Sequence, residues 1–464
     1  MNNGELIKLN NNDFSFTCGA FSNSIVNGTS TPQFFPISFG SVNEIVINDN
    51  LFDPFVDVEL SLKTPGSFLE NTPFVNFSFK SNNRNLISFS IEQKRGFTGE
   101  SQSHEKFKFI GAICDSNVIT SDTSLGELQT FKLIDANEAS LRETKVSGRY
   151  EKIRGDISVS ENIFNIINDV TGINKDEELF RDSDVNIDYL LPNHFNGYDA
   201  INFLLPYNVT TDNTIPVQCL VKYDYIKGTL LNVPITSPFT EANGPKTNLE
   251  TFLLGDNRDI PFRALKDSDR DLSPQGPQPQ YIPIDNKLNN IAYNNVTFGI
   301  SNEDLLPCYV MNTTSPTNTN SFAFVDLEEE IKAFDENIIK LLADLYGDGV
   351  RLNVDLDTSK TDKNNYRVIS SVFSNDINVK VAKSQLYNSF ILQNMFLSFT
   401  TNGQLYREPG KFINITKDLS QNNTGSAFEK KIIGQWLITE VKHIITGNGL
   451  YKNLIQCVKP FVNK

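Results

Sequence analysis

The sequence has little of what enzymes and metal proteins use for chemistry. Its 464 residues include only three histidines, His104, His194 and His443, and none lies within metal-ligand spacing of another. No nucleophile elbow, phosphate-binding loop or dinucleotide-binding fingerprint occurs. We therefore predict no catalytic residue, no cofactor-binding residue and no metal site, and we do not expect the chain to be an enzyme.

Cysteines and long apolar runs are scarce too. The cysteines are odd in number, far apart and without a CxxC pair, so neither a disulfide framework nor a zinc knuckle is expected. We expect reduced and mostly buried thiols at Cys18, Cys114, Cys219, Cys308 and Cys457. No apolar run approaches the ~20 residues needed to cross a bilayer, and the N-terminus lacks a signal-peptide pattern. These absences predict a soluble protein made in a cytoplasm, with no membrane insertion.

Basic residues are outnumbered by acidic ones. Asp and Glu total 56 against 41 for Lys and Arg, which gives a formal net charge of -15. A sequence-independent grip on phosphates needs clustered Lys and Arg, so this balance excludes an ordinary nucleic-acid-binding protein. It is compatible with a passage that DNA moves through without being held.

What the sequence does contain favours β-strands. Phenylalanine supplies 35 residues, and β-branched residues are frequent, and both suit a pleated, half-buried surface. Short apolar or alternating runs separated by Asn, Pro and Gly occur at 43–48, 56–62, 74–80, 86–91 and 107–111. Such spacing predicts a sandwich or a small barrel. The length predicts about two to four domains in the whole chain.

Three helices are predicted from the spacing of apolar residues. The first begins at Ser160 as its N-cap and ends at Gly172. The second covers 199–205, immediately before a proline. The third runs over 327–346, with apolar residues at alternating steps of four and three. This third stripe fits burial against the chain's own sheet, with an oligomer seam as the alternative.

Two other segments carry clear local signals. Residues 232–285 are rich in Pro, Gly, Asn and Asp and contain a strong breaker at 273–279. They are interpreted as a surface loop or as an extended arm that reaches a neighbouring subunit. Near the C-terminus, alternating segments at 432–445 and 450–462 flank Gly-Asn-Gly at 447–449. This pattern predicts a terminal β-hairpin whose turn uses positive-φ positions.

An ordered set of motifs occupies the last third. Residues 397–403 read LSFTTNG, 407–415 read REPGKFINI and 434–438 read GQWLI, while 196–204 upstream read NGYDAINFL. Together they resemble the baseplate hub proteins of contractile-tailed, T4-like bacteriophages, which are related to the hub portions of contractile injection systems. Trp436 is the only tryptophan, and as a large anchor on a closing strand it is expected to be buried in a small barrel.

The resemblance implies a mainly β fold with α+β parts, in which mixed α/β domains join two small β-barrel-like domains. On this basis we place an N-terminal β-barrel-like domain at 1–150 and an α/β connecting domain at 151–205. A strand- and loop-rich region with the Pro/Gly-rich extension follows at 206–325. A helical or α+β domain takes 326–395, and 396–464 supply the C-terminal strands that complete the second barrel.

The resemblance also implies a function. Such a chain is a structural central hub of the baseplate, a homotrimeric ring that adapts a sixfold tail tube to a threefold spike. The implied partners are the tail tube protein, the tail spike protein, and baseplate wedge or other baseplate proteins, with DNA passing through the channel unbound during genome ejection. The implied location is the virion tail, after assembly in the host cytoplasm. Two alternatives stay open: a tail-associated glycan or peptidoglycan hydrolase using a carboxylate pair, and a receptor-binding tail-tip adhesin.

Overall fold

The computed structural model describes residues 5–10, 12–26, 29–64, 86–93, 106–120, 127–146, 152–212, 215–235, 250–255, 280–283, 308–312, 322–325, 367–371, 373–392, 395–405, 407–417 and 434–459. The predicted strand at 74–80, the breaker at 273–279 and the predicted helix at 327–346 lie outside them. Strands dominate the described part, with a smaller share of helices, so the prediction of a mainly β chain with α+β parts is confirmed. No helix in the described part is both long and apolar enough to span a membrane.

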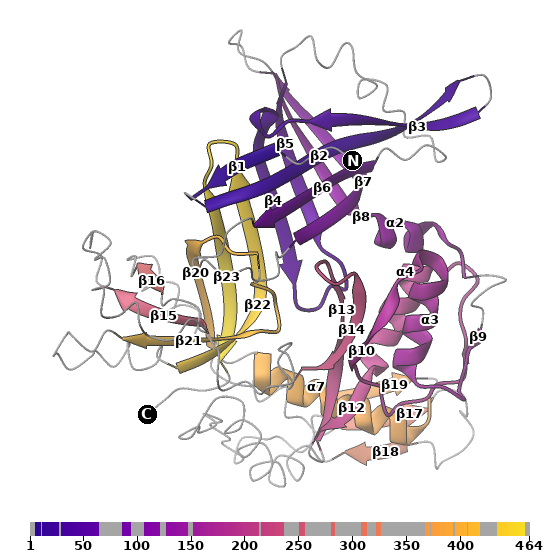
Figure 1. Cartoon of the computed structure of the whole chain (residues 1–464). Coiled ribbons are helices and arrows are strands. Elements are labelled where there is room, and N and C mark those ends of the chain that lie inside the picture. The colour runs from indigo at the N-terminus through magenta and orange to yellow at the C-terminus, as the bar shows by residue number, and fades with distance from the viewer. Residues whose placement is uncertain are drawn as a thin grey trace.

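Eight N-terminal strands form one curled half of a large sheet (Figure 1). Neighbours in the order β1-β2-β6-β7-β8-β5-β4 pair antiparallel, and β3 pairs with β2. Burial alternates along the strands, so one face of this half covers a core: in β5, Val58, Leu60 and Leu62 are buried, while Asp57 and Glu59 are exposed. The strands are β1 (Glu5–Leu9), β2 (Asn12–Val26), β3 (Thr29–Ile37), β4 (Val42–Asn50), β5 (Asp57–Thr64), β6 (Leu86–Gln93), β7 (Lys106–Thr120) and β8 (Glu127–Asp135), with a 3-10 turn, η1 (Phe39–Ser41), before β4.

Six later strands continue the same sheet. Along one edge of β22, its first residues pair with β21 and its later residues pair with β4. The other edge of β22 pairs with β23. The two barrel-like units that the resemblance implied are therefore two halves of one 14-stranded sheet, joined where β4 meets β22. The strands of this half are β15 (Glu250–Gly255), β16 (Gln280–Pro283), β20 (Met395–Asn402), β21 (Phe412–Lys417), β22 (Gly434–Thr446) and β23 (Tyr451–Lys459).

The predicted terminal hairpin and its anchor are confirmed. β22 and β23 pair antiparallel across the turn at 447–449, in which Gly449 has a φ of 87°. Trp436 is 1% exposed and lies opposite Ile413 of β21. Gly434 begins the same strand with a φ of 124°, which a side chain would disfavour. The tryptophan thus packs as a core anchor rather than as a surface contact.

A mixed α/β unit is connected to the first half of the sheet. Figure 1 shows α2, α3 and α4 packed to one side of the sheet β10-β14-β13-β12. The buried faces of these helices and strands form one core, which includes Ile163, Ile167 and Leu204. The elements are α2 (Ala136–Glu143), β9 (Lys152–Ile153), α3 (Val159–Thr171), β10 (Asn174–Phe180), β11 (Tyr189–Leu190), α4 (Gly197–Leu204), η3 (Leu205–Tyr207), β12 (Val209–Asp212), β13 (Ile215–Asp224) and β14 (Thr229–Pro234).

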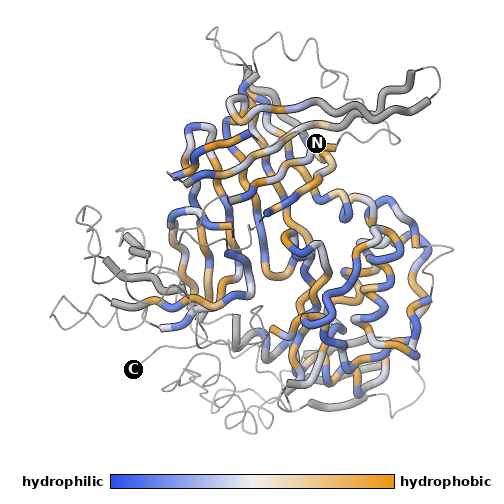
Figure 2. Tube along the Cα trace, in the orientation of Figure 1, coloured by the Kyte–Doolittle hydropathy of each residue, from blue (hydrophilic) through white to orange (hydrophobic). Residues whose placement is uncertain are grey.

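The last described group packs against this unit. The helix α7 (Asn375–Leu392) contacts β13 and a small sheet of order β18-β17-β19. That sheet consists of β17 (Cys308–Asn312), β18 (Phe322–Val325) and β19 (Arg367–Ser371). In Figure 2 apolar and polar residues alternate along the strands of the large sheet.

The helix boundaries differ slightly from those predicted. The N-cap of α3 is Ser158, whose side chain accepts a hydrogen bond from Glu161 N, so the assignment to Ser160 is wrong. The predicted end is confirmed, since Gly172 adopts the left-handed conformation with a φ of 75°. The second helix, α4, begins two residues earlier than predicted, at the capping box of Asn196.

Candidate assembly surface

The pairing of β4 with β22 produces one wall from both halves of the sheet. The pairing runs from Glu44 opposite Thr446 to Asn50 opposite Glu440. Because β4 also pairs with β5, and β22 with β23, the strands β8-β5-β4-β22-β23-β20 are hydrogen-bonded in sequence. We call these six strands the wall.

The outward face of the wall is polar and nearly neutral. Residues that lie directly opposite each other on paired strands share a face of the sheet, so the strand registers identify the residues of this outward face. This face contains three lysines and four carboxylates, which gives it a formal charge of -1. All are exposed or half-buried: Thr130, Lys132, Ile134, Asp57, Glu59, Ser61, Glu44, Val46, Asn48, Asn50, Glu440, Lys442, Ile444, Thr446, Lys452, Leu454, Gln456, Ser398, Thr400 and Asn402.

The C-terminal hairpin closes the N-terminal half. Its turn lies between β4 and the turn that follows β1: Gly447 N donates to Asn43 O at 2.9 Å, and Asn10 N donates to Gly449 O at 3.0 Å. A Cβ on Gly447 would come within 1.9 Å of the Val42 carbonyl oxygen, so only glycine fits there. The two ends of the chain thus build one closed unit.

Tyr451 extends the contact between the C-terminal hairpin and the N-terminal half into the core. Its backbone exchanges hydrogen bonds with the side chain of Asn10, and its ring meets Phe14 edge-on at 6.0 Å. Leu405, Ile445 and Tyr451 all belong to the core of the N-terminal strands. That core is consequently incomplete without residues from the C-terminal part.

A buried polar network explains the arginine of the REPG motif. Arg407 is 1% exposed, and its Nη1 donates to the Asn402 carbonyl and, at 2.7 Å, to Asn453 Oδ1. Gln404 N donates to the same oxygen at 2.7 Å. Arg407 therefore fixes the chain between β20 and β21 onto β23. The sequence indicated this residue only as part of a motif, because its partner lies 46 residues away.

His443 belongs to the same network. Since Asn453 Oδ1 accepts two hydrogen bonds, its Nδ2 is the atom that donates to His443 Nδ1, at 2.9 Å. Tyr451 O–H meets the same ring nitrogen at 2.8 Å, so Nδ1 is an acceptor and the imidazole is neutral. Burial first, and then the charge of Arg407, lower the pKa of His443 to about 3. His443 is thus a packed structural residue.

A buried lysine fixes the α/β unit to the sheet. Lys222 Nζ, on β13, lies 2.5 Å from Asp49 Oδ1, 2.7 Å from Asn50 O and 2.8 Å from Asp53 O. All three oxygens belong to the end of β4 and the turn after it. Three acceptors satisfy the three protons of the ammonium group. The direction in which β13 meets the sheet is therefore set by charge-assisted hydrogen bonds.

Tyr225 makes a second attachment nearby. Its hydroxyl donates to Asp135 Oδ2 at 2.8 Å and accepts from Val56 N at 3.0 Å. Burial raises the pKa of Asp135, an effect that the hydrogen bond from Tyr225 opposes. Tyr225 also stacks on Phe107 of β7, with ring centroids 5.1 Å apart. The end of β13 is consequently held by both polar and aromatic contacts.

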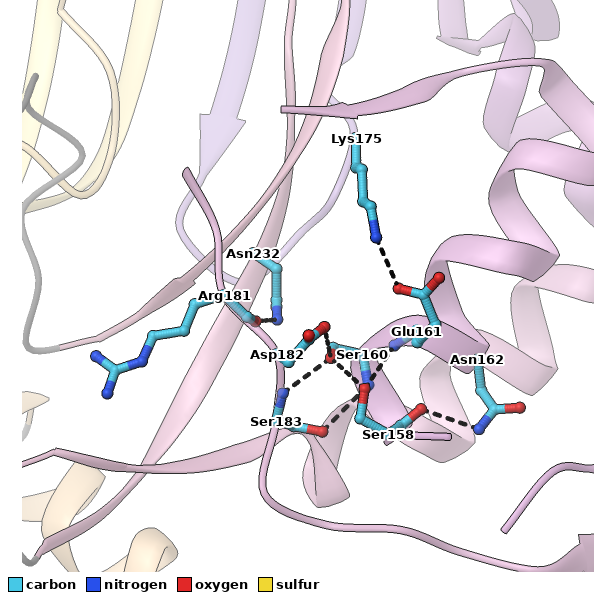
Figure 3. A network of polar contacts seen from close by, with 9 residues as sticks. All are labelled: Ser158, Ser160, Glu161, Asn162, Lys175, Arg181, Asp182, Ser183 and Asn232. Carbon is cyan, nitrogen blue, oxygen red and sulfur yellow. Dashed lines mark hydrogen bonds and ion pairs between the residues drawn. The ribbon is translucent and has the colours of Figure 1, made fainter. Parts of the chain in front are cut away.

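The first turn of α3 is filled by the chain's own polar groups (Figure 3). Ser160 and Ser183 exchange hydrogen bonds: Ser183 N donates to Ser160 Oγ at 2.9 Å, and Ser160 N donates to Ser183 Oγ at 3.2 Å. The side chain of Asn232 donates to Arg181 O and holds the same loop. A helix N-terminus is a ready anion site only when its N–H groups are available. Here they secure the loop that precedes Val185, so the turn is structural.

The remaining residues singled out in the sequence are dispersed. His194 is exposed in the α/β unit, whereas His443 is buried on β22 of the large sheet, and His104 lies outside the described residues. The described part contains no cluster of three metal-ligating side chains. Cys18, Cys219 and Cys457 are buried as predicted, whereas Cys114 is exposed because it lies at the irregularity between β7 and β8.

Neither a protein-family model nor a curated protein matches the chain. Its fold is similar to a tail protein from Neisseria meningitidis MC58, at 8% identity and a TM-score of 0.47, covering 97% of this chain and 98% of the other. It is also similar to the 43 kDa tail protein of prophage MuSo2 from Shewanella oneidensis, at 11% identity and a TM-score of 0.45, covering 96% and 99%.

A third similar structure is a chain of the PdpA–VgrG complex from Francisella, at 11% identity and a TM-score of 0.42. The match covers 96% of this chain and 52% of that one. Two of these three proteins are tail proteins by name. At such identities the likenesses concern the fold alone.

Proposed function

We propose that the chain is a structural subunit of the central hub of a phage tail baseplate, and that three copies form a ring around a channel. One observation carries the proposal: β4 and β22 join two curled half-sheets into a single wall within one chain. Three such chains side by side supply six half-sheets. That number fits a sixfold tail tube on one side of the ring, while the threefold symmetry of the ring fits a spike on the other.

The outward face of the wall is the surface that we assign to the channel. It runs across both half-sheets without interruption, and its formal charge is -1, from three lysines and four carboxylates. DNA is held by clustered cations, and the cations of this face are outnumbered. Lys442, for example, pairs with Glu440 at 3.2 Å. Such a lining supports passage of DNA during genome ejection without retention.

The proposed partners are the tail tube protein, the spike protein, and baseplate wedge or other baseplate proteins. The proposed location is the tail baseplate of the virion, after assembly in the host cytoplasm. An adaptor between two symmetries has to hold its parts in fixed directions. The attachments of Lys222 and Tyr225 support this role, because they fix the α/β unit to the sheet through buried hydrogen bonds.

The hydrolase alternative requires two carboxylates that face a cleft. The buried carboxylates of Asp49 and Asp135 are engaged by Lys222 and Tyr225 of the same chain, which fits a structural role. No feature of the described residues specifically favours a receptor-binding adhesin. The ring is therefore the function that the contacts support best.

Native mass spectrometry tests the proposal. One chain has a mass of 52.2 kDa, and we expect a species of three times this mass when the protein is mixed with its tube and spike proteins. A chain that stays monomeric with both partners present contradicts the proposal. Hydrolysis of peptidoglycan by the pure chain, lost on changing a single carboxylate, would favour the hydrolase instead.

A further inference from the structure

The strands β2 and β3 extend beyond the sheet to which they belong. β6 pairs with β2 only as far as Phe21, whereas β3 stays paired with β2 until Thr29 meets Val26. Among the described residues, 22–26 and 29–33 therefore pair only with each other. Figure 1 shows them as a two-stranded projection from the N-terminal half, which we call the ribbon. An isolated pair of strands is at best marginally stable in water, so a further strand along the ribbon would add to its stability.

The ribbon lies in the longest uncharged part of the chain. Residues 14–43 contain no Asp, Glu, Lys or Arg, although these residue types make up 21% of the sequence. Exposed strand edges of soluble proteins are usually protected by charges, most often by lysine. The centres of protein interfaces, in contrast, are depleted of charged residues. The composition of the ribbon is therefore that of an interface.

Only one edge of the ribbon is suited to accept another strand. In an antiparallel ladder, alternate residues direct their N–H and C=O groups to opposite edges, so Pro32 and Pro36 of β3 share an edge. Proline has no N–H to donate, and sheets accept it where that position faces outward. The outer edge of β3 thus lacks two donors. Asn23 and Ile25, on β2, direct their groups to the opposite edge, which contains no proline.

We infer that the ribbon adds, through its β2 edge, to a sheet of a second copy of this chain. Each copy carries a formal charge of -15, so copies repel one another overall, and a contact without charged residues adds nothing to that repulsion. A basic partner would instead be recognised by acidic side chains, and residues 14–43 have none. The inference rests on the proposed ring, which places copies side by side, and it names the contact that joins them.

A pair of proline variants tests this inference on the two edges separately. Ile25 and Ser30 face each other across the ribbon, and each directs its own N–H outward. Ile25→Pro removes a donor from the β2 edge, whereas Ser30→Pro adds a third proline to the edge that already has two. We expect Ile25→Pro to lower the association constant of the ring by about tenfold or more, and Ser30→Pro to leave it unchanged. Emission from Trp436 checks that both variants fold.

The outcomes separate the inference from the proposed ring. If the wild type forms the ring and the two proline variants assemble to the same extent as each other, whether that extent is high or low, the proposed ribbon contact is wrong. The proposed ring is then unaffected. If the wild type itself stays monomeric with its partners, the ring is wrong. A photoreactive amino acid at position 24 gives a second readout, for which we expect a crosslink between two copies of this chain. Crosslinks to the tube or spike protein alone would overturn the inference.

Discussion

Replacing His443 by asparagine isolates the effect of one buried histidine on stability. Asparagine keeps an acceptor oxygen near the position of Nδ1, where Asn453 and Tyr451 donate, and it has no proton to gain. The pKa of His443 falls from 6.5 to about 3 on folding. Because the folded pKa is the lower one, the unfolded chain binds more protons between these values. Stability linked to His443 is therefore present above pH 6.5 and is lost as the pH falls towards 3.

The two pKa values lie about 3.5 pH units apart, which corresponds to about 5 kcal/mol over the whole window. Between pH 7 and pH 5 the expected loss is about 2 kcal/mol. Urea unfolding followed by Trp436 emission measures the free energy of unfolding at each pH. We expect the advantage of the wild type over His443→Asn to shrink by about 2 kcal/mol between pH 7 and pH 5. Carboxylates titrate in both proteins, so their contribution cancels in this difference.

The matched control is His194→Asn, because His194 is exposed and lies in a different unit of the fold. This variant should follow the wild type at every pH. A constant difference between wild type and His443→Asn from pH 7 to pH 5 would refute the neutral, doubly accepting imidazole. So would a His194→Asn variant with the same pH dependence as His443→Asn.

Two further sets of variants test the attachment of the α/β unit to the sheet and the outward face of the wall. Lys222→Met should lower the free energy of unfolding by about 3–5 kcal/mol, because Asp49 is left as an unpaired buried charge. Adding Asp49→Asn to this variant should restore part of the lost stability. Urea unfolding of both variants measures the two changes. Changing Glu44, Glu59 and Glu440 to lysine moves the formal charge of the channel face from -1 to +5 per copy, since each change adds two charges. We expect this ring to retain DNA in gel-shift assays at low salt and to release it as salt rises, whereas the matched glutamine variant should retain far less.

The local structure followed closely from the sequence where burial alternates along a strand. The runs at 43–48 and 86–91 lie within β4 and β6, and the ends of both strands of the terminal hairpin were predicted to within three residues. The strand β2 was not predicted, although buried Phe14, Phe16 and Cys18 alternate with Ser15 and Thr17 in its first half. The choice between Ser158 and Ser160 as N-cap depended on Ser183, which lies more than twenty residues away.

No local sequence pattern predicted the contacts that build the candidate assembly surface. Lys222 meets Asp49 across 173 residues, and Asn10 meets Tyr451 across 441. Gly447 was interpreted as a turn residue, whereas its main constraint is the close approach of the Val42 carbonyl. Pairing over such distances depends on the register of strands, and no pattern within either strand specifies its partner. The resemblance implied two barrels but not that they share one sheet.

A reconstruction of the protein assembled with its tube and spike proteins tests the central claim most directly. We expect three copies around one channel, with the outward face of the wall lining it and β4 next to β22 in every copy. Glu59, Lys132 and Lys442 should then face the channel. A ring in which these residues face the outside, or a single copy bound at the tail, would contradict the proposed hub.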